Sequence, residues 1–217
     1  MKRANRRSMS SEGRSEPALR TVPIQARALQ SVEVILNAAA QLLDEVGLER
    51  FNTNLLAEQA NVRVRTVYRY FPNKYAVLLA LAQRMTQEWD DWMDREFVKL
   101  ADPKQDWETE QRRITPSLLK KIAERPGELT LFKSMGMIPG LLELDRLFFE
   151  RWTLKMSVAF KQRGVMLPSA QIRNVCRVSL ISTTAGVDQY FRLEKAERPH
   201  FLSELINMQI AYLRIYL

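Results

Sequence analysis

Between residues 74 and 100, apolar side chains recur every three or four positions. They are Val77, Leu78, Leu81, Met85, Trp89, Trp92 and Met93. This spacing gathers them on one face of an α-helix, so we expect a single long amphipathic helix from Lys74 to about Leu100. The rest of the chain has to pack around it. Strand-forming residues are not clustered and only 7 glycines occur in 217 residues, which favours an all-α fold.

Further helices are predicted on both sides of this segment. After Pro23, Ile35, Ala39, Leu42, Leu43 and Val46 follow a helical period up to Gly47, where a glycine can end a helix. Thr53 is expected to cap a short second helix, and Asn61 to adopt the left-handed turn after it. The remaining predicted segments are 106–125 (interrupted at Pro116), 129–137, 141–163, 169–193 and 199–217.

The stretch NVRVRTVYRYFPNK, residues 61–74, allows two interpretations. As a strand it alternates well and is rich in β-branched and aromatic residues. As a helix from Arg63 to Phe71, it places Val64, Val67, Tyr68 and Phe71 on one side. Arg65, Thr66, Arg69 and Tyr70 would then lie on the other side. We favour the helix, because a lone strand between helices has no partner, and we expect Val67 and Phe71 to be core residues.

The positive charge is concentrated at the N-terminus. The net charge is +8, and residues 1–30 hold seven Lys and Arg against two Glu, which gives 7 − 2 = +5. This balance suggests an anionic partner, either nucleic acid or a membrane surface. We expect residues 1–24 to form a disordered basic arm, residues 25–75 a first domain and residues 76–217 a second. The arm would add a diffuse, salt-dependent attraction or enter a DNA minor groove.

The inventory of reactive side chains argues against an enzyme. The chain has one histidine, His200, and one cysteine, Cys176, and it lacks a glycine-rich phosphate loop. We therefore expect no catalytic site, no metal site and no cofactor. Cys176 is interpreted as a buried small apolar residue, since no intrachain disulfide is possible. No apolar run is long enough to span a bilayer, so we expect a cytoplasmic protein that has no membrane partner.

Two short helices joined by a tight turn, the second of them basic, can present one helix to the major groove of DNA. Lys74 stands at a predicted helix N-terminus, where free N–H groups already favour a phosphate. Thr53 is predicted to occupy the same kind of position on the preceding helix.

The run FNTNLLAEQANVRVRTVYRYFPNKYAVLLAL resembles the DNA-binding head of the tetracycline-repressor (TetR) family. The resemblance covers about residues 25–80. It rests on Thr53, Leu56-Ala57, Ala60-Asn61-Val62, the run Thr66 to Phe71, and Asn73-Lys74. It implies an all-α fold, with a helix-turn-helix head joined by a long helix to a domain for ligand binding and dimerisation.

The resemblance also implies which residues touch DNA. Together with the basic residues of the second helix, the expected DNA-binding set is Thr53, Asn54, Arg63, Val64, Arg65, Thr66, Tyr68, Arg69, Tyr70 and Lys74. Three positions depart from the family pattern: Asn61 replaces glycine, Arg63 replaces a capping residue, and Arg65 replaces a small residue. An arginine at position 65 is long enough to contact guanine, so we expect a guanine in the half-site.

For the second domain the resemblance implies a pocket and a homodimer through the last two helices. The expected ligand-binding residues are Trp89, Trp92, Met93, Trp107, Phe132, Phe148, Trp152 and Met156. Large apolar side chains at helical spacing are more often ordinary core residues. The residues from Ser169 to Leu193 include small ones that let another helix approach closely.

These features predict a transcriptional regulator, in particular a repressor that leaves a palindromic double-stranded operator when a small, apolar effector binds. Two alternatives remain open from the sequence. One is a TetR-like activator. The other is a nonspecific basic protein that binds nucleic acid or a membrane surface.

Overall fold

A computed structural model describes residues 26–217, and within that part of the chain every regular element is an α-helix. The helices are α1 (Ala26–Arg50), α2 (Thr53–Gln59), α3 (Val64–Tyr70), α4 (Lys74–Ala101), α5 (Trp107–Ala123), α6 (Glu128–Met135), α7 (Pro139–Arg163), α8 (Ser169–Arg192) and α9 (Arg198–Leu213). The all-α prediction is confirmed, and residues 61–74 hold a helix rather than a strand. The expected basic arm, residues 1–24, lies outside the described residues.

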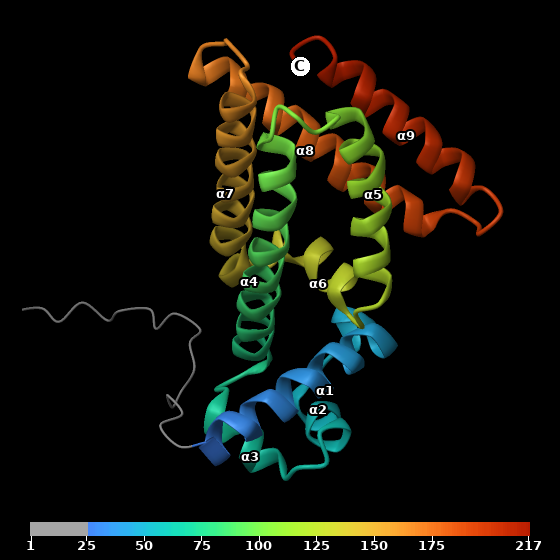
Figure 1. Cartoon of the computed structure of the whole chain (residues 1–217). Coiled ribbons are helices and arrows are strands. Elements are labelled where there is room, and N and C mark those ends of the chain that lie inside the picture. Colours follow the sequence, from blue (N-terminus) through green and yellow to red (C-terminus); the bar gives the residue numbers. More distant parts are fainter. Residues whose placement is uncertain (1–25) are drawn as a thin grey trace, which may run out of the picture.

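Helices α1, α2 and α3 form a small head at the lower end of the molecule in Figure 1. Its core is built from apolar side chains of all three helices, including Ile35, Leu43, Leu56, Val67 and Phe71, each at most 1% exposed. Val67 and Phe71 are therefore core residues, as predicted. The regular part of α1 ends at Gly47, whose φ of 71° is accessible to glycine at little cost, and a further turn reaches Arg50.

Helix α4 runs from the head into the body of the molecule, where it lies alongside α7 (Figure 1). Its bounds agree with the predicted Lys74 to Leu100. Val77, Leu78, Leu81, Met85 and Trp89 are buried, as their spacing requires. One continuous element thus belongs to both halves of the molecule.

Two expectations about prolines need correction. Pro116 does not interrupt α5, which continues through it from Trp107 to Ala123. A proline removes one backbone donor and disfavours the turn before it, but it does not forbid a helix held by packing. The helix predicted over 141–163 begins two residues earlier, at Pro139, because a proline in the first turn lacks only an N–H that would have no partner there.

Helices α8 and α9 approach each other closely at Gly186. A Cβ atom built at Gly186 would lie 2.6 Å from both terminal carbons of Leu205, so a larger residue would require the Leu205 side chain to move. The expected close helix contact is thus made within one chain. Cys176 on α8 is fully buried, and burial raises the pKa of its thiol, which is the predicted environment of a small apolar residue.

Within residues 26–217, no helix is both long enough and apolar enough to cross a bilayer.

Candidate nucleic-acid interface and effector cavity

The turn between α2 and α3 fixes the angle between these two helices. The N–H of Val62 donates to the Ala57 carbonyl at 2.9 Å, and the N–H of Asn61 donates to the Glu58 carbonyl at 3.0 Å. This is the Schellman pattern, which requires a left-handed residue at Asn61. Asn61 has φ 50°, so asparagine takes the place of the usual glycine, as expected.

Helix α2 is capped by Asn52 and not by Thr53. The Asn52 side chain accepts hydrogen bonds from the N–H groups of Asn54 and Leu55, both at 3.0 Å. The prediction that Thr53 is the cap is therefore wrong by one residue. Asparagine is preferred to threonine as a cap, which agrees with the choice of Asn52 in the structure.

Thr53 instead faces inward, at 9% exposure, and its hydroxyl lies 3.0 Å from the hydroxyl of Tyr68. The hydroxyl of Tyr68 is therefore tied to the start of α2, although the Tyr68 side chain is 40% exposed. Thr53 is better placed to hold Tyr68 than to contact DNA. Asn54, one residue further, is exposed.

The surface of α3 differs from the prediction at its two tyrosines, Tyr68 and Tyr70. Arg63, Arg65 and Arg69 are exposed, whereas Val64 and Thr66 are partly exposed. Tyr70 is only 4% exposed and belongs to the core of the head, so its expected place on the outer side of α3 is wrong. In a helix of seven residues, the two tyrosines are interchangeable by spacing alone, and here Tyr68 faces out while Tyr70 faces in.

Lys74 begins α4, the helix that follows the head, and its side chain lies near the loop between α1 and α2. Asn73 caps this helix by accepting from the Ala76 N–H at 3.0 Å, and Arg63 leaves the start of α3 without a side-chain cap, as predicted. The Lys74 ammonium lies 3.4 Å from the carbonyl of Phe51 and 5.5 Å from the centre of the Tyr75 ring. It therefore bridges the loop before α2 and the start of α4.

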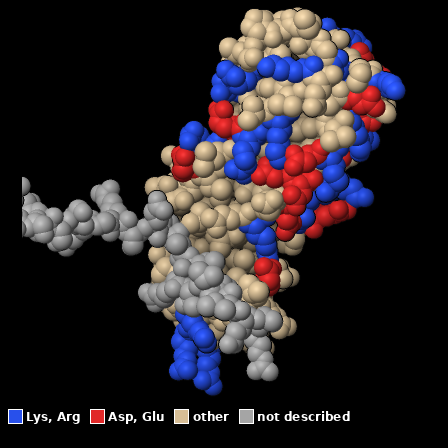
Figure 2. Space-filling view, turned by 60° about the vertical axis from the view of Figure 1, so that its left-hand side comes forward, with Lys and Arg blue, Asp and Glu red and all other residues tan. Residues whose placement is uncertain are grey.

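Basic side chains project from the lower end of the molecule in Figure 2, the end that holds α2 and α3 in Figure 1. Higher up, Lys and Arg are interleaved with Asp and Glu. Arg63 and Arg65 have no ion pair within residues 26–217. The exposed end of the head thus presents positive charge that the described protein does not neutralise.

A cavity of about 390 Å³ lies in the body. Its walls come from α4, α5, α6, α7 and α8 and are mostly apolar. Four of the predicted pocket residues line it, namely Trp89, Phe132, Phe148 and Trp152. Phe148 and Trp152 are in contact with ring centres 4.6 Å apart and planes tilted by 54°, and the ring of Trp89 lies 6.2 Å from that of Trp152.

The other four predicted pocket residues lie elsewhere. Trp92, Met93 and Met156 border a separate space of about 50 Å³, and Trp107, which begins α5, is not in the wall of the larger cavity. These four side chains therefore do not line the larger cavity, and their part in ligand binding stays a prediction. The indole N–H of Trp152 is also not free for a ligand, because it donates to Asp90 at 3.2 Å.

Sequence reasoning missed the polar residues of the wall, which include Glu128, Lys133, Asp145 and Asp188. Burial raises the pKa of the Glu128 carboxyl. The hydrogen bonds from Arg125 and from the Trp89 N–H act in the other direction but do not outweigh it. Trp89 donates to Glu128 at 3.0 Å. The sequence signal for Glu128 is its place three residues after Arg125, at the start of a short helix, where it can pair with that arginine.

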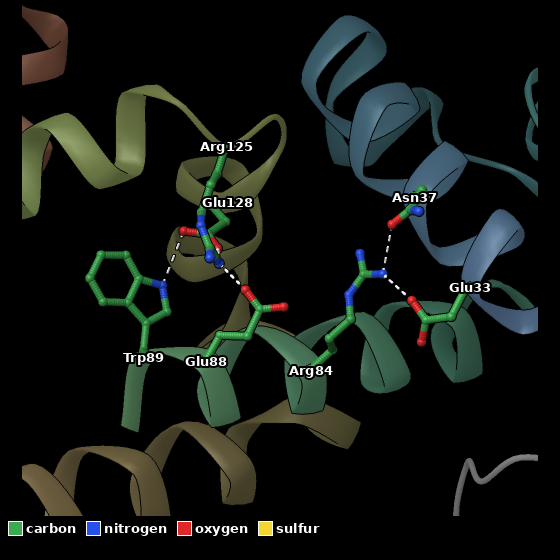
Figure 3. Close-up of polar contacts among 7 residues, drawn as sticks. All are labelled: Glu33, Asn37, Arg84, Glu88, Trp89, Arg125 and Glu128. Carbon is green, nitrogen blue, oxygen red and sulfur yellow. Dashed lines mark hydrogen bonds and ion pairs between the residues drawn. The ribbon is translucent and has the colours of Figure 1, made fainter. Parts of the chain in front are cut away.

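Two groups of polar contacts, one turn apart on α4, lie between this cavity and the head (Figure 3). Arg125 binds both Glu128, at 2.8 Å, and Glu88 of α4. One turn earlier on α4, Arg84 donates to Glu33 at 3.0 Å and to Asn37 at 2.8 Å, both on α1. We call these residues together the junction network: Trp89, Glu128, Arg125, Glu88, Arg84, Glu33 and Asn37.

The backbone of the two regions also meets here. The N–H of Gly127 donates to Asp44 of α1 at 3.0 Å. Gly127 has φ 70°, and a Cβ built on it would lie 2.3 Å from the Ala40 carbonyl oxygen. The start of α6 is therefore seated on α1, with no room for a side chain between them.

This geometry defines a helix-turn-helix DNA-binding protein whose head is attached to a helical domain with an internal cavity. Comparisons with known proteins give its family. Residues 35–81 match the model described as bacterial regulatory proteins, tetR family, and residues 106–213 match the tetracyclin repressor-like C-terminal domain. The chain belongs to the tetR family of transcriptional regulators, which bind DNA and are not enzymes.

Similar individual proteins agree with this placement. The tetracycline repressor protein class C of Escherichia coli is 37% identical over 76 residues, which cover 31% of this chain and 34% of that protein. The alignment thus spans about a third of that relative's length. A tetR-family regulator from Streptomyces coelicolor has the same fold, with a TM-score of 0.68, 16% identity, and coverage of 86% of this chain and 82% of that one.

A second solved structure is the multidrug binding protein EbrR complexed with imidazole. It aligns with a TM-score of 0.63 and 16% identity, over 86% of this chain and 96% of that one.

Proposed function

We propose that the protein is a sequence-specific repressor, which binds a palindromic operator as a homodimer and leaves it when a small molecule fills the cavity. The observation that carries the proposal is the pair of exposed arginines at α3, Arg63 and Arg65, which form no ion pair within residues 26–217. They belong to a head whose α1 meets the junction network beside the cavity wall. A protein of this kind acts where the chromosome is, so we propose the cytoplasm as its compartment.

In the bound state, α3 lies in the major groove. Arg65 and Thr66 face base edges there, with Tyr68 beside them, and Val64 offers apolar contact. Arg63, Arg69 and Asn54 lie within reach of the flanking phosphates, and Lys74 holds a phosphate at the N-terminus of α4. Thr53 positions Tyr68, and Tyr70 takes no part because it is buried.

The dimer is proposed to form through α8 and α9. Each of these helices leaves apolar side chains exposed, with Val178 at 47% and Ile181 at 56% on α8, and Met208 at 49% on α9. Exposed apolar groups clustered on neighbouring helices are typical of a protein interface. Packing against the same face of a second copy would bury them and present two heads to one palindrome.

Release of DNA requires that the effector favour one arrangement of the two heads over another. Trp89 and Glu128 line the cavity and also belong to the junction network, so a ligand that displaces them acts on Arg125 and Glu88. The next turn of α4 holds Arg84 and its partners on α1. The ligand would thereby change the angle of the head and the spacing of the two α3 helices. Its effect is limited by the difference between its affinities for the two arrangements.

A small-molecule effector is supported by the size and apolar lining of the cavity, which fall in the range of known ligand sites. The structural neighbour EbrR is described as a multidrug binding protein. A regulator that activates transcription would use the same head and cavity.

The test is selection of bound duplexes from a random pool at about 150 mM salt, at which the nonspecific phosphate contribution is weak. We expect enrichment of a palindrome with half-sites about one helical turn apart. Binding without enrichment, which disappears as salt rises, would instead show a nonspecific basic protein. The position of the enriched site relative to the promoter, with a reporter assay, separates repression from activation.

A further inference from the structure

Helix α7 places a carboxylate beside the aromatic part of the cavity. Asp145, Phe148, Phe149 and Trp152 are three, four and seven residues apart, so they share one face of the helix, and all four line the cavity. Asp145 also lies against the end of α6, since a Cβ built at Gly136 would be 3.6 Å from its Oδ2 atom. The carboxylate is therefore part of the wall and is held between α6 and α7.

Aromatic rings from other helices complete the apolar part of the wall. Trp89 comes from α4 and Phe132 from α6. Phe132 meets Phe148 edge to face, with ring centres 6.4 Å apart. Rings that surround a cavity in this way offer π faces and edges to a ligand, and the faces attract positive charge.

The other charged groups of the wall already have partners. Glu128 accepts hydrogen bonds from Trp89 and Arg125. Lys133 forms an ion pair with Asp188, which is also paired with Arg192 at 2.8 Å. Across residues 26–217, Asp145 has neither a hydrogen bond nor an ion pair, and burial raises the pKa of its carboxyl. Partial desolvation without a counter-charge leaves a place for a cation.

We propose that the cavity takes an organic cation, with the positive group beside Asp145 and an aromatic or otherwise apolar body among the rings of α4, α6 and α7. This inference rests on the proposed function of the cavity as the effector site. The cation would supply the charge that Asp145 lacks and would also be attracted by the faces of the rings.

An anionic ligand fits the same wall less well. Lys133, the lysine of the wall, would have to give up Asp188. Lys121 is close, with its ammonium 4.8 Å from the centre of the Trp89 ring, but it does not line the cavity. An anion would also lie near the carboxylates of Glu128 and Asp145, which would repel it.

The experiment uses two ions of the same shape and opposite charge, tetraphenylphosphonium and tetraphenylborate, with triphenylmethanol as a neutral probe. Binding to the full chain is followed by tryptophan fluorescence and confirmed by calorimetry. We expect the phosphonium to bind at least tenfold more tightly than the borate. Asp145→Asn should remove that preference and leave binding of the neutral probe unchanged, whereas Asp145→Glu should keep it.

Glu143→Gln is the matched control, because it removes one negative charge from the same helix outside the cavity wall, where Glu143 pairs with Arg146. Equal losses in Glu143→Gln and Asp145→Asn would show an effect of net charge and overturn the assignment of Asp145. Equal or tighter binding of the borate, or binding of the neutral probe alone, would overturn the cation inference and leave the effector cavity standing. If none of the three probes binds, both the inference and the proposed effector site fail.

Discussion

Arg65 on α3 and Arg125 beside α6 both belong to functional regions, yet their surroundings differ. Arg65 is exposed and has no ion pair within the described residues, whereas Arg125 is held by Glu88 and Glu128. The same contrast holds for the regions around them. Near Arg65, Arg63 is also exposed without an ion pair in the described residues, whereas Arg84 of the junction network connects α4 to α1. The arginine proposed to contact DNA thus has no ion pair within the described residues, whereas the arginine beside the cavity is held by two carboxylates.

The largest effect is expected at Gly127, where the start of α6 in the body touches α1 of the head. Gly127→Ala places a Cβ against the Ala40 carbonyl at a positive φ, so both overpacking and backbone strain oppose it. We expect a loss of about 2–5 kcal/mol in the free energy of unfolding, measured by denaturant titration. Gly47→Ala is the control, since Gly47 also has positive φ but nothing within 4 Å of a built Cβ. The backbone conformation at Gly47, φ 71° and ψ 174°, should by itself cost Gly47→Ala about 1–3 kcal/mol. Equal losses would mean that the seat of α6 on α1 is not tight.

The next largest effect should come from a free cation of the head. Arg65→Ala should weaken binding to the selected operator by about 1–3 kcal/mol and relax the preference at one base, a guanine. Arg146→Ala in α7 is the comparison, because Arg146 is similarly charged but paired with Glu143. It should leave operator affinity unchanged in a fluorescence anisotropy titration. An operator whose base preferences survive Arg65→Ala would show that Arg65 touches only phosphate.

Lys74 is expected to act on all DNA sequences alike. Lys74→Ala should lower the slope of log affinity against log salt by about one unit, on the operator and on random duplex. Thr66→Ala should act mainly on the operator, because Thr66 is proposed to face bases. If the two variants change specific and random binding in the same proportion, the assignment of contacts on α3 and α4 is wrong.

The smallest effect distinguishes the caps of the two regions. Asn52 caps α2 with a neutral side chain, whereas Asp106 caps α5 with a carboxylate. The hydrogen bond from the Thr109 hydroxyl is the main cause that lowers the pKa of Asp106 below its unfolded value. Its contribution to stability is therefore complete above the unfolded pKa and is lost as pH falls through the lower, folded pKa.

Thermal melts between pH 7 and acid pH should show this difference. Asp106→Asn should flatten a small part of the acid dependence, whereas Asn52→Ala should cost about 1 kcal/mol at every pH. An unchanged acid profile in Asp106→Asn would indicate that the carboxylate contributes nothing as an ion.

The head was the more predictable region because its signals are local. Asn61 supplies the left-handed residue of a turn that closes within six residues, and Pro72 with Asn73 separates α3 from α4. The errors there are small rotations and shifts. Spacing over seven residues does not decide whether Tyr68 or Tyr70 faces the core. Asn52 is a better cap than the adjacent Thr53, so cap preference alone points to the residue that caps α2 in the structure.

The cavity was less predictable because no local pattern defines it. Five helices contribute to its wall, and the sequence shows which side chains are apolar but not which gaps remain between them. Trp89 and Met93 lie one turn apart on α4, yet only Trp89 lines the cavity. The unpaired state of Asp145 likewise depends on the absence of a partner on α6 and α8, which only the fold determines.

The central claim is that the body fixes the spacing of two heads that read DNA. The most direct measurement compares the affinity for the selected palindrome with that for the same half-sites moved apart by about five base pairs, half a helical turn. The account predicts two chains on the original duplex and a loss of at least about a hundredfold on the altered one. Equal affinity for the two duplexes would contradict it, because the heads would then bind independently of the body.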